Sequence, residues 1–247
     1  MGKLFNIDSP FMRFLSRLAD LMILNILVLI TSIPVITIGA SFTAMHYVLI
    51  KMVRDEETYI TKMYFKSFKE NFLQATALWL IVAAFGAVFV GDYYIFLRTE
   101  TKFPTIFVIA VFAVAVLYLM TVMYIFPLQA RFYNTVGRTI KNAFLVMILN
   151  FPRSLLMLLL YAVPVVLLIF SSFAVPFLFM FGFSAPGLGA VYLYRKVFSR
   201  FEPEAAAITD DMDFHVEGIE ESEEKNDGIE EISAVEDEST DDPVRSE

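Results

Sequence analysis

The chain has 247 residues, of which 57% are hydrophobic and 19% charged, and it contains no cysteine. The absence of cysteine excludes a disulfide scaffold, a thiol nucleophile and a cysteine-ligated metal site. The net charge of -8 conceals two unlike parts, because residues 1–201 carry 17 Lys and Arg against 8 Asp and Glu, whereas residues 202–247 carry 2 against 19. The composition therefore predicts two regions, 1–201 and 202–247.

The region 202–247 has few large apolar residues and a high density of like charge. Such a segment cannot bury enough apolar surface to offset its chain entropy. We expect it to be a disordered, acidic, cytoplasmic tail that is dispensable for membrane insertion.

Residues 18–200 are almost continuously apolar, with short interruptions that bear Lys and Arg. Two of the runs, Phe72 to Leu97 and Pro104 to Leu128, hold about 25 residues each, and roughly 20 apolar residues suffice for a helix to cross a bilayer. Hydrocarbon offers no partner to backbone N–H and C=O groups, and the runs lack the alternation of barrel strands. The sequence predicts an all-α polytopic membrane helix bundle in the cell membrane, with the lipid bilayer as its main partner.

The first apolar run, Leu18 to Ile50, contains Pro34 near its midpoint. Proline has no N–H and disfavours the helical conformation at Ile33, which predicts a helical hairpin with the arms Phe11 to Ile33 and Val35 to Val53. With a hairpin, every strongly basic flank lies in the cytoplasm. The chain then crosses six times, with the hairpin tip outside and both termini in the cytoplasm. One long kinked helix, which gives five crossings, and a re-entrant pair that does not reach the far side are the alternatives.

Two cytoplasmic segments are amphipathic. Apolar side chains recur every four residues from Ile60 to Phe72 and again from Phe132 to Phe144, with cations opposite them. The pattern is typical of interfacial helices, and we expect these cations to face lipid headgroups: Lys62, Lys66, Lys69, Arg131, Arg138 and Lys141. Cations in this position favour anionic lipid over nucleic acid. A shift of 72 residues aligns the segments, which makes an internal duplication a hypothesis.

Polar residues within the apolar runs are few, and such residues are the usual pointers to function. The residues that we select as interaction or packing candidates are Asp20, Asn25, Pro34, Gly39, His46 and Asp92. A lone histidine without neighbouring carboxylates makes neither a metal site nor a proton relay. No set of catalytic groups or metal ligands can be assembled, so we expect no enzyme, no metal and no cofactor.

Several motifs along the chain match one family pattern: Leu4-Phe5-Asn6 with Asp8-Ser9-Pro10 and Arg13-Phe14, Ser32 to Ala40, Lys51 to Glu57, Phe65 to Phe72, and Thr139 to Ala143. In these motifs the chain resembles the YesL family of bacterial integral membrane proteins, over about residues 4–200. The family is defined by a domain of unknown function, and its genes often neighbour those of carbohydrate ABC importers. The acidic tail has no counterpart in the family pattern.

A mixed-charge cluster, Arg54-Asp55-Glu56-Glu57, follows the second arm of the hairpin. It is either a docking point for a partner protein or a solvated helix end with weak internal ion pairs. The resemblance and the lack of catalytic groups favour an accessory or scaffold protein associated with carbohydrate ABC transport, with membrane transport proteins as candidate partners. A small-solute carrier or channel is the alternative.

Overall fold

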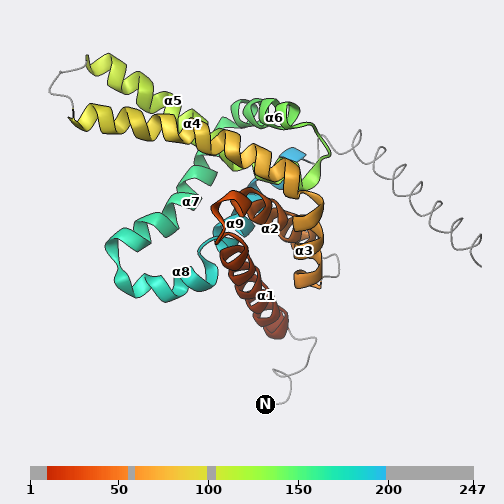
Figure 1. Cartoon of the computed structure of the whole chain (residues 1–247). Helices are drawn as coiled ribbons and strands as arrows, with labels where there is room; N and C mark the ends of the chain where they lie inside the picture. The colour runs from red at the N-terminus through yellow and green to blue at the C-terminus, as the bar shows by residue number, and fades with distance from the viewer. Residues whose placement is uncertain (1–9, 55–58, 99–103, 199–247) are drawn as a thin grey trace, which may run out of the picture. The chain divides into compact units, whose positions relative to one another are not determined.

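The computed structural model describes residues 10–54, 59–98 and 104–198, which are helical almost throughout (Figure 1). In chain order the elements are α1 (Pro10–Thr31), η1 (Val35–Thr37), α2 (Ile38–Val53), α3 (Ile60–Glu70), α4 (Phe72–Arg98), α5 (Thr105–Arg131), α6 (Val136–Leu149), α7 (Phe151–Phe170), η2 (Ser172–Ala174), α8 (Val175–Phe181) and α9 (Ser184–Phe198). No strand occurs within these ranges, and the predicted all-α fold is confirmed. The chain divides into the units Met1–Val197 and Phe198–Glu247. The predicted acidic tail, 202–247, lies outside the described residues.

The break at Pro34 and the two predicted arms are confirmed. Helix α1 ends at Thr31, and Pro34 is exposed in an extended conformation with φ -73° and ψ 112°. The Thr37 hydroxyl donates hydrogen bonds to the carbonyl oxygens of Thr31 and Pro34. These bonds close the turn, and α2 begins one residue later.

Within the described ranges, five helical segments are long and apolar enough to cross a membrane: α1, η1 with α2, α4, α5 and α7. A sixth crossing is possible if two successive segments count as one span. The first segment is η2 with α8, the second is α9, and the angle between them is 59°. These counts follow from length and composition, and the larger one agrees with the predicted six crossings. The count of five is not the predicted alternative, which took the first apolar run as a single kinked helix, because both arms of that run are counted here. The protein is a polytopic membrane protein.

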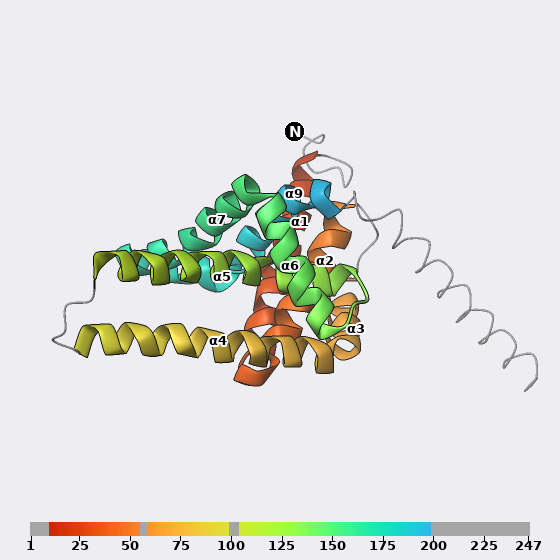
Figure 2. The same ribbon diagram turned by 90° about the horizontal axis from the view of Figure 1, so that it is seen from above.

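Helix α2 forms the centre of the packing, because most of its residues from Gly39 to Met52 are buried. It packs against α1, α3, α4 and α5. Among the residues of α4 whose burial is described, Ala75, Leu78 and Val82 are buried, and the buried residues of α5 lie between Met120 and Gln129. Figure 2 shows α4 and α5 extending together to one side, while α1 runs across their near ends.

Helix α3 forms where an amphipathic helix was predicted, but the expectation that its apolar side faces lipid is wrong. The second segment was predicted to begin too early, because Arg131 is the last residue of α5, Phe132 is extended, and α6 begins at Val136. Ile60 and Tyr64 are buried inside the protein, because α3 packs along α2 and α1. In α6 the buried positions are Thr139, Ala143, Val146 and Met147, whereas Phe144 is exposed. The four-residue pattern in α3 therefore reflects tertiary packing.

Candidate functional site

Asn25 of α1 reaches the bend between α8 and α9. Its Nδ2 donates to the Phe179 carbonyl oxygen at 2.7 Å, and its Oδ1 accepts from the backbone N–H groups of Phe183 at 2.8 Å and Ser184 at 3.1 Å. A helix break leaves backbone groups without intrahelical partners, and such groups are costly in an apolar environment. The fully buried Asn25 amide therefore supplies the bonds that the broken helix has lost.

The bend also requires a glycine. A Cβ atom on Gly182 would collide with the Leu178 carbonyl oxygen and lie 3.2 Å from its carbonyl carbon. The Gly182 N–H donates to that same oxygen at 2.7 Å, so the close approach is part of the hydrogen bond that ends α8. Ser184, the first residue of α9, is buried, and its Oγ has no hydrogen-bond partner.

His46 of α2 lies between two tyrosines from distant helices. Its Nδ1 is 3.1 Å from the Tyr194 hydroxyl of α9, and its Nε2 is 3.4 Å from the Tyr161 hydroxyl of α7. A neutral imidazole has one donor and one acceptor, and a hydroxyl can serve either. The three side chains therefore join α2, α7 and α9 without any charge.

A second set of buried polar side chains connects α3, α5 and α6. Asn71 Nδ2 donates to the Ser67 carbonyl oxygen and hydroxyl at 3.1 and 3.4 Å. Gln129 Nε2 donates to Asn71 Oδ1 at 3.1 Å, and the Thr139 hydroxyl donates to Gln129 Oε1 at 3.4 Å. We call Ser67, Asn71, Gln129 and Thr139 the amide chain. It ties the two amphipathic helices to the end of α5.

Other predicted site residues do not converge on one place. Asp20 is half-buried near the middle of α1, one turn after Arg17, whose charge acts on it. Asp92 is exposed on α4. Gly39 is buried where α2 meets Ala75 and Trp79 of α4. These positions serve local pairing, hydration and close packing.

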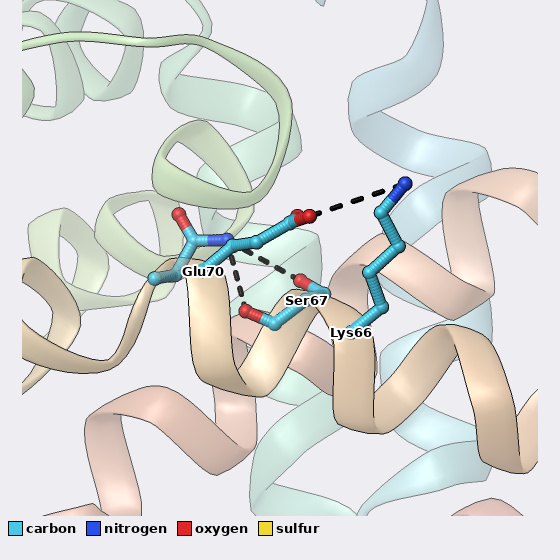
Figure 3. Close-up of polar contacts among 4 residues, drawn as sticks. Lys66, Ser67 and Glu70 are labelled. Carbon is cyan, nitrogen blue, oxygen red and sulfur yellow. Dashed lines mark hydrogen bonds and ion pairs between the residues drawn. The ribbon is translucent and has the colours of Figure 1, made fainter. Parts of the chain in front are cut away.

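The predicted lipid-facing cations Lys62, Lys66, Lys69, Arg138 and Lys141 are exposed, and Arg131 is partly covered. Lys66 lies 3.9 Å from Glu70 on the same helix (Figure 3). Such an exposed pair contributes about 0.3–0.5 kcal/mol. Arg54 is exposed at the end of α2, whereas Asp55 and Glu56 of the predicted mixed-charge cluster lie outside the described residues.

The main residues that sequence reasoning missed are tyrosines and a glutamine on apolar helices: Tyr124, Tyr161, Tyr194 and Gln129. Polar side chains in apolar helices often bond across helices, which was the available signal, yet their partners are far away in the sequence. Among the described residues, no group of three or more His, Cys, Asp or Glu side chains could hold a metal ion.

Comparison with known proteins gives one family match. Residues 21–93 match the family model for DUF624, described as a protein of unknown function. No curated protein and no solved structure matches the chain. The matched residues run from α1 to α4 and include Asn25, Gly39 and His46. The match covers 73 of the 247 residues, from the second half of α1 through α2 and α3 to most of α4.

Proposed function

We propose that the protein is a YesL-type accessory or scaffold component of a carbohydrate ABC transport system, and that it is not an enzyme. One observation carries the proposal: the buried Asn25, His46 and Gln129 side chains bond to other helices of the same chain. These side chains use their hydrogen-bonding groups to hold helices together, and this is what we expect of buried polar residues in a rigid scaffold.

The exposed cations of α3 and α6 support a partner at the cytoplasmic face. Lys62, Lys69, Arg138 and Lys141 are exposed, and cytoplasmic loops of membrane proteins carry an excess of such residues. In this proposal both termini are cytoplasmic. Anionic headgroups and a transport protein share this face.

The test is affinity purification of the full chain from native membranes, followed by mass spectrometry. We expect subunits of a carbohydrate importer to be enriched over a control purification with an unrelated polytopic protein. A matched variant with Lys62, Lys66 and Lys69 changed to Glu should lose them while still inserting. Absence of importer subunits, together with unchanged carbohydrate uptake after deletion of the gene, would contradict the proposal.

A carrier or channel is the second candidate, and the bent α8–α9 pair favours it. Discontinuous helices form the substrate sites of many transporters, and the buried Ser184 hydroxyl at this bend has no partner. Solute flux through proteoliposomes that contain the purified chain, abolished in Asn25→Leu, would support this alternative over the scaffold.

A further inference from the structure

We propose that the α1–α2 hairpin is a re-entrant element that inserts into one leaflet and contacts its acyl chains without crossing the bilayer. The first observation is the place of its tip. Gly39, two residues after η1, lies against Ala75 and Trp79, and η1 itself packs on α4. The tip therefore lies beside the first turns of α4.

The far end of α4 is distant from this contact. The segment from Ala75 to Arg98 is about 35 Å long at 1.5 Å rise per residue, which exceeds the roughly 30 Å hydrocarbon core of a bilayer. Helix α4 is apolar along its length and is buried only near its start. A crossing α4 therefore puts the hairpin tip and Phe72 on the same side.

Helix α3 gives independent evidence for that placement. The Tyr64 hydroxyl is 2.6 Å from the Thr31 hydroxyl at the end of α1 and donates to the Ser41 carbonyl oxygen at 3.5 Å. Thr31 Oγ1 is also 2.9 Å from Ser41 Oγ. The tip of the hairpin is thus bonded to the helix that immediately precedes α4. A tip on the far face would separate these groups by the thickness of the membrane.

The surface that the hairpin offers to lipid is apolar. At the tip, Ile33 is 77% exposed and Val35 66%. Along α1, Phe11, Phe14 and Leu15 are exposed, whereas Arg13, Arg17 and Asp20 share one face at helical spacing. An apolar surface beside a charged stripe fits a helix at the boundary between acyl chains and headgroups.

The distribution of charge is compatible with this arrangement. The tip, residues 32–37, carries no charge, so the basic flanks stay on one side whether the hairpin crosses twice or not at all. The chain then crosses at α4, α5, α7 and the bent α8–α9 pair. The sequence prediction of an external tip used charges that do not distinguish the two arrangements, and the contacts at Gly39 and Tyr64 do.

The position of the hairpin tip is tested by distances between two spin labels in the full chain, reconstituted in liposomes, with one pair of labels in each variant. The chain has no cysteine, and Val35, Lys66 and Thr105 are exposed, so each accepts a label. Double electron–electron resonance should give a shorter distance for the pair Val35→Cys/Lys66→Cys than for Val35→Cys/Thr105→Cys. The reverse order would overturn the proposal.

Sidedness is tested separately in intact cells and inverted vesicles with a membrane-impermeant maleimide. Lys66→Cys and Thr105→Cys mark the two sides of the bilayer. Val35→Cys should stay unlabelled from the side on which Thr105→Cys reacts. Labelling of Val35→Cys from that side would show that the hairpin crosses and would overturn the proposal.

Discussion

Two regions of the molecule, α3–α4 and α6–α7, are built alike. In each, an amphipathic helix ends at one asparagine and a long apolar helix begins at the next residue. Asn71 and Asn150 both donate their backbone N–H at 3.0 Å and their Nδ2 at 3.1 Å to the carbonyl oxygen four residues earlier, on Ser67 and Val146. The asparagine satisfies a carbonyl at the end of one helix while the chain changes direction.

The two asparagines differ in what their remaining oxygen bonds. Asn71 Oδ1 accepts from Gln129 of α5 at 3.1 Å, whereas Asn150 Oδ1 accepts from Arg153 of its own segment at 3.0 Å. The first junction is therefore fixed to another part of the protein and the second is closed locally. A similar local sequence thus supports a tertiary contact in one region and a self-contained cap in the other.

The spacing of the junctions also differs from the predicted repeat. Ser67 and Thr139 are related by the shift of 72 residues, and both are buried members of the amide chain. Asn71 and Asn150 are instead 79 positions apart. The extra seven residues, about two helical turns, lie between Thr139 and Asn150, so α6 continues further beyond its buried threonine than α3 does beyond Ser67. Duplication stays a hypothesis, since both offsets preserve the helix face.

The largest expected difference between the regions concerns their glycine contacts. A Cβ on Gly39 would collide with the Ala75 carbonyl oxygen and lie 2.7 Å from Trp79 Cβ, whereas a Cβ on Gly137 of α6 meets nothing within 4 Å. Gly39→Ala should destabilise the fold by about 2 kcal/mol or more, since overpacking typically costs 1–3 kcal/mol. Gly137→Ala should stabilise it slightly because alanine favours helix.

The single tryptophan gives the measurement for this pair. Trp79 is the one tryptophan in the chain, and it lies at the α2–α4 contact. Its fluorescence during thermal unfolding in detergent reports the stability of both variants. Equal midpoints for Gly39→Ala and Gly137→Ala would show that α2 does not pack on α4 as described.

The next prediction separates the two asparagines. Asn71→Ala should lower the free energy of unfolding by about 1–3 kcal/mol, because it leaves the buried Gln129 amide without its acceptor. Asn150→Ala should cost less, since Arg153 is able to reach water or headgroups. A double-mutant cycle of Asn71→Ala with Gln129→Ala should show coupling of about 0.5 kcal/mol or more, and Asn150→Ala with Gln129→Ala should be additive. Coupling in the second cycle would contradict the assigned difference.

The sequence predicted those features of the fold that depend on residues close together in the chain. Span length, the Pro34 break and amphipathic periodicity depend on neighbouring residues, and all three appear in the structure. The central position of α2 does not follow from such signals. Its polar and small residues, such as Ser41 and Thr43, gave no periodic pattern, although they are buried.

The candidate site was predicted less well because its contacts are remote in the sequence. His46 was described as a lone histidine, but its partners Tyr161 and Tyr194 lie 115 and 148 positions away. Asn25 was selected as an interaction or packing candidate, and its partner at Phe179 is 154 positions away. Which helices meet is decided by packing over the whole chain, which no local pattern encodes.

A smaller effect is expected at the contact between α7 and α5. The Ser154 hydroxyl donates to the Tyr124 hydroxyl at 3.1 Å, and both side chains are buried. Tyr124→Phe removes this bond but leaves Ser154 two backbone carbonyl acceptors, on Met147 and Asn150. The free energy of unfolding should fall by about 1 kcal/mol, as measured by Trp79 fluorescence during thermal unfolding. A loss as large as that of Gly39→Ala would mean that Tyr124 does more than bond Ser154.

The smallest effect concerns Tyr64, which attaches α3 to the hairpin. Burial raises the pKa of the Tyr64 hydroxyl above its ordinary value, and the hydrogen bonds with Thr31 and Ser41 oppose this less strongly. Because the folded state holds the proton more tightly, the contribution is fully present below about pH 10, the ordinary tyrosine pKa, and is lost as the pH rises through the folded value. The unfolding temperature, followed by Trp79 fluorescence, should therefore fall less between neutral and alkaline pH in Tyr64→Phe than in the wild-type chain. Tyr59, which is 84% exposed, provides the control, because Tyr59→Phe should keep the wild-type pH dependence. Identical profiles for all three proteins would mean that Tyr64 is not buried against the hairpin.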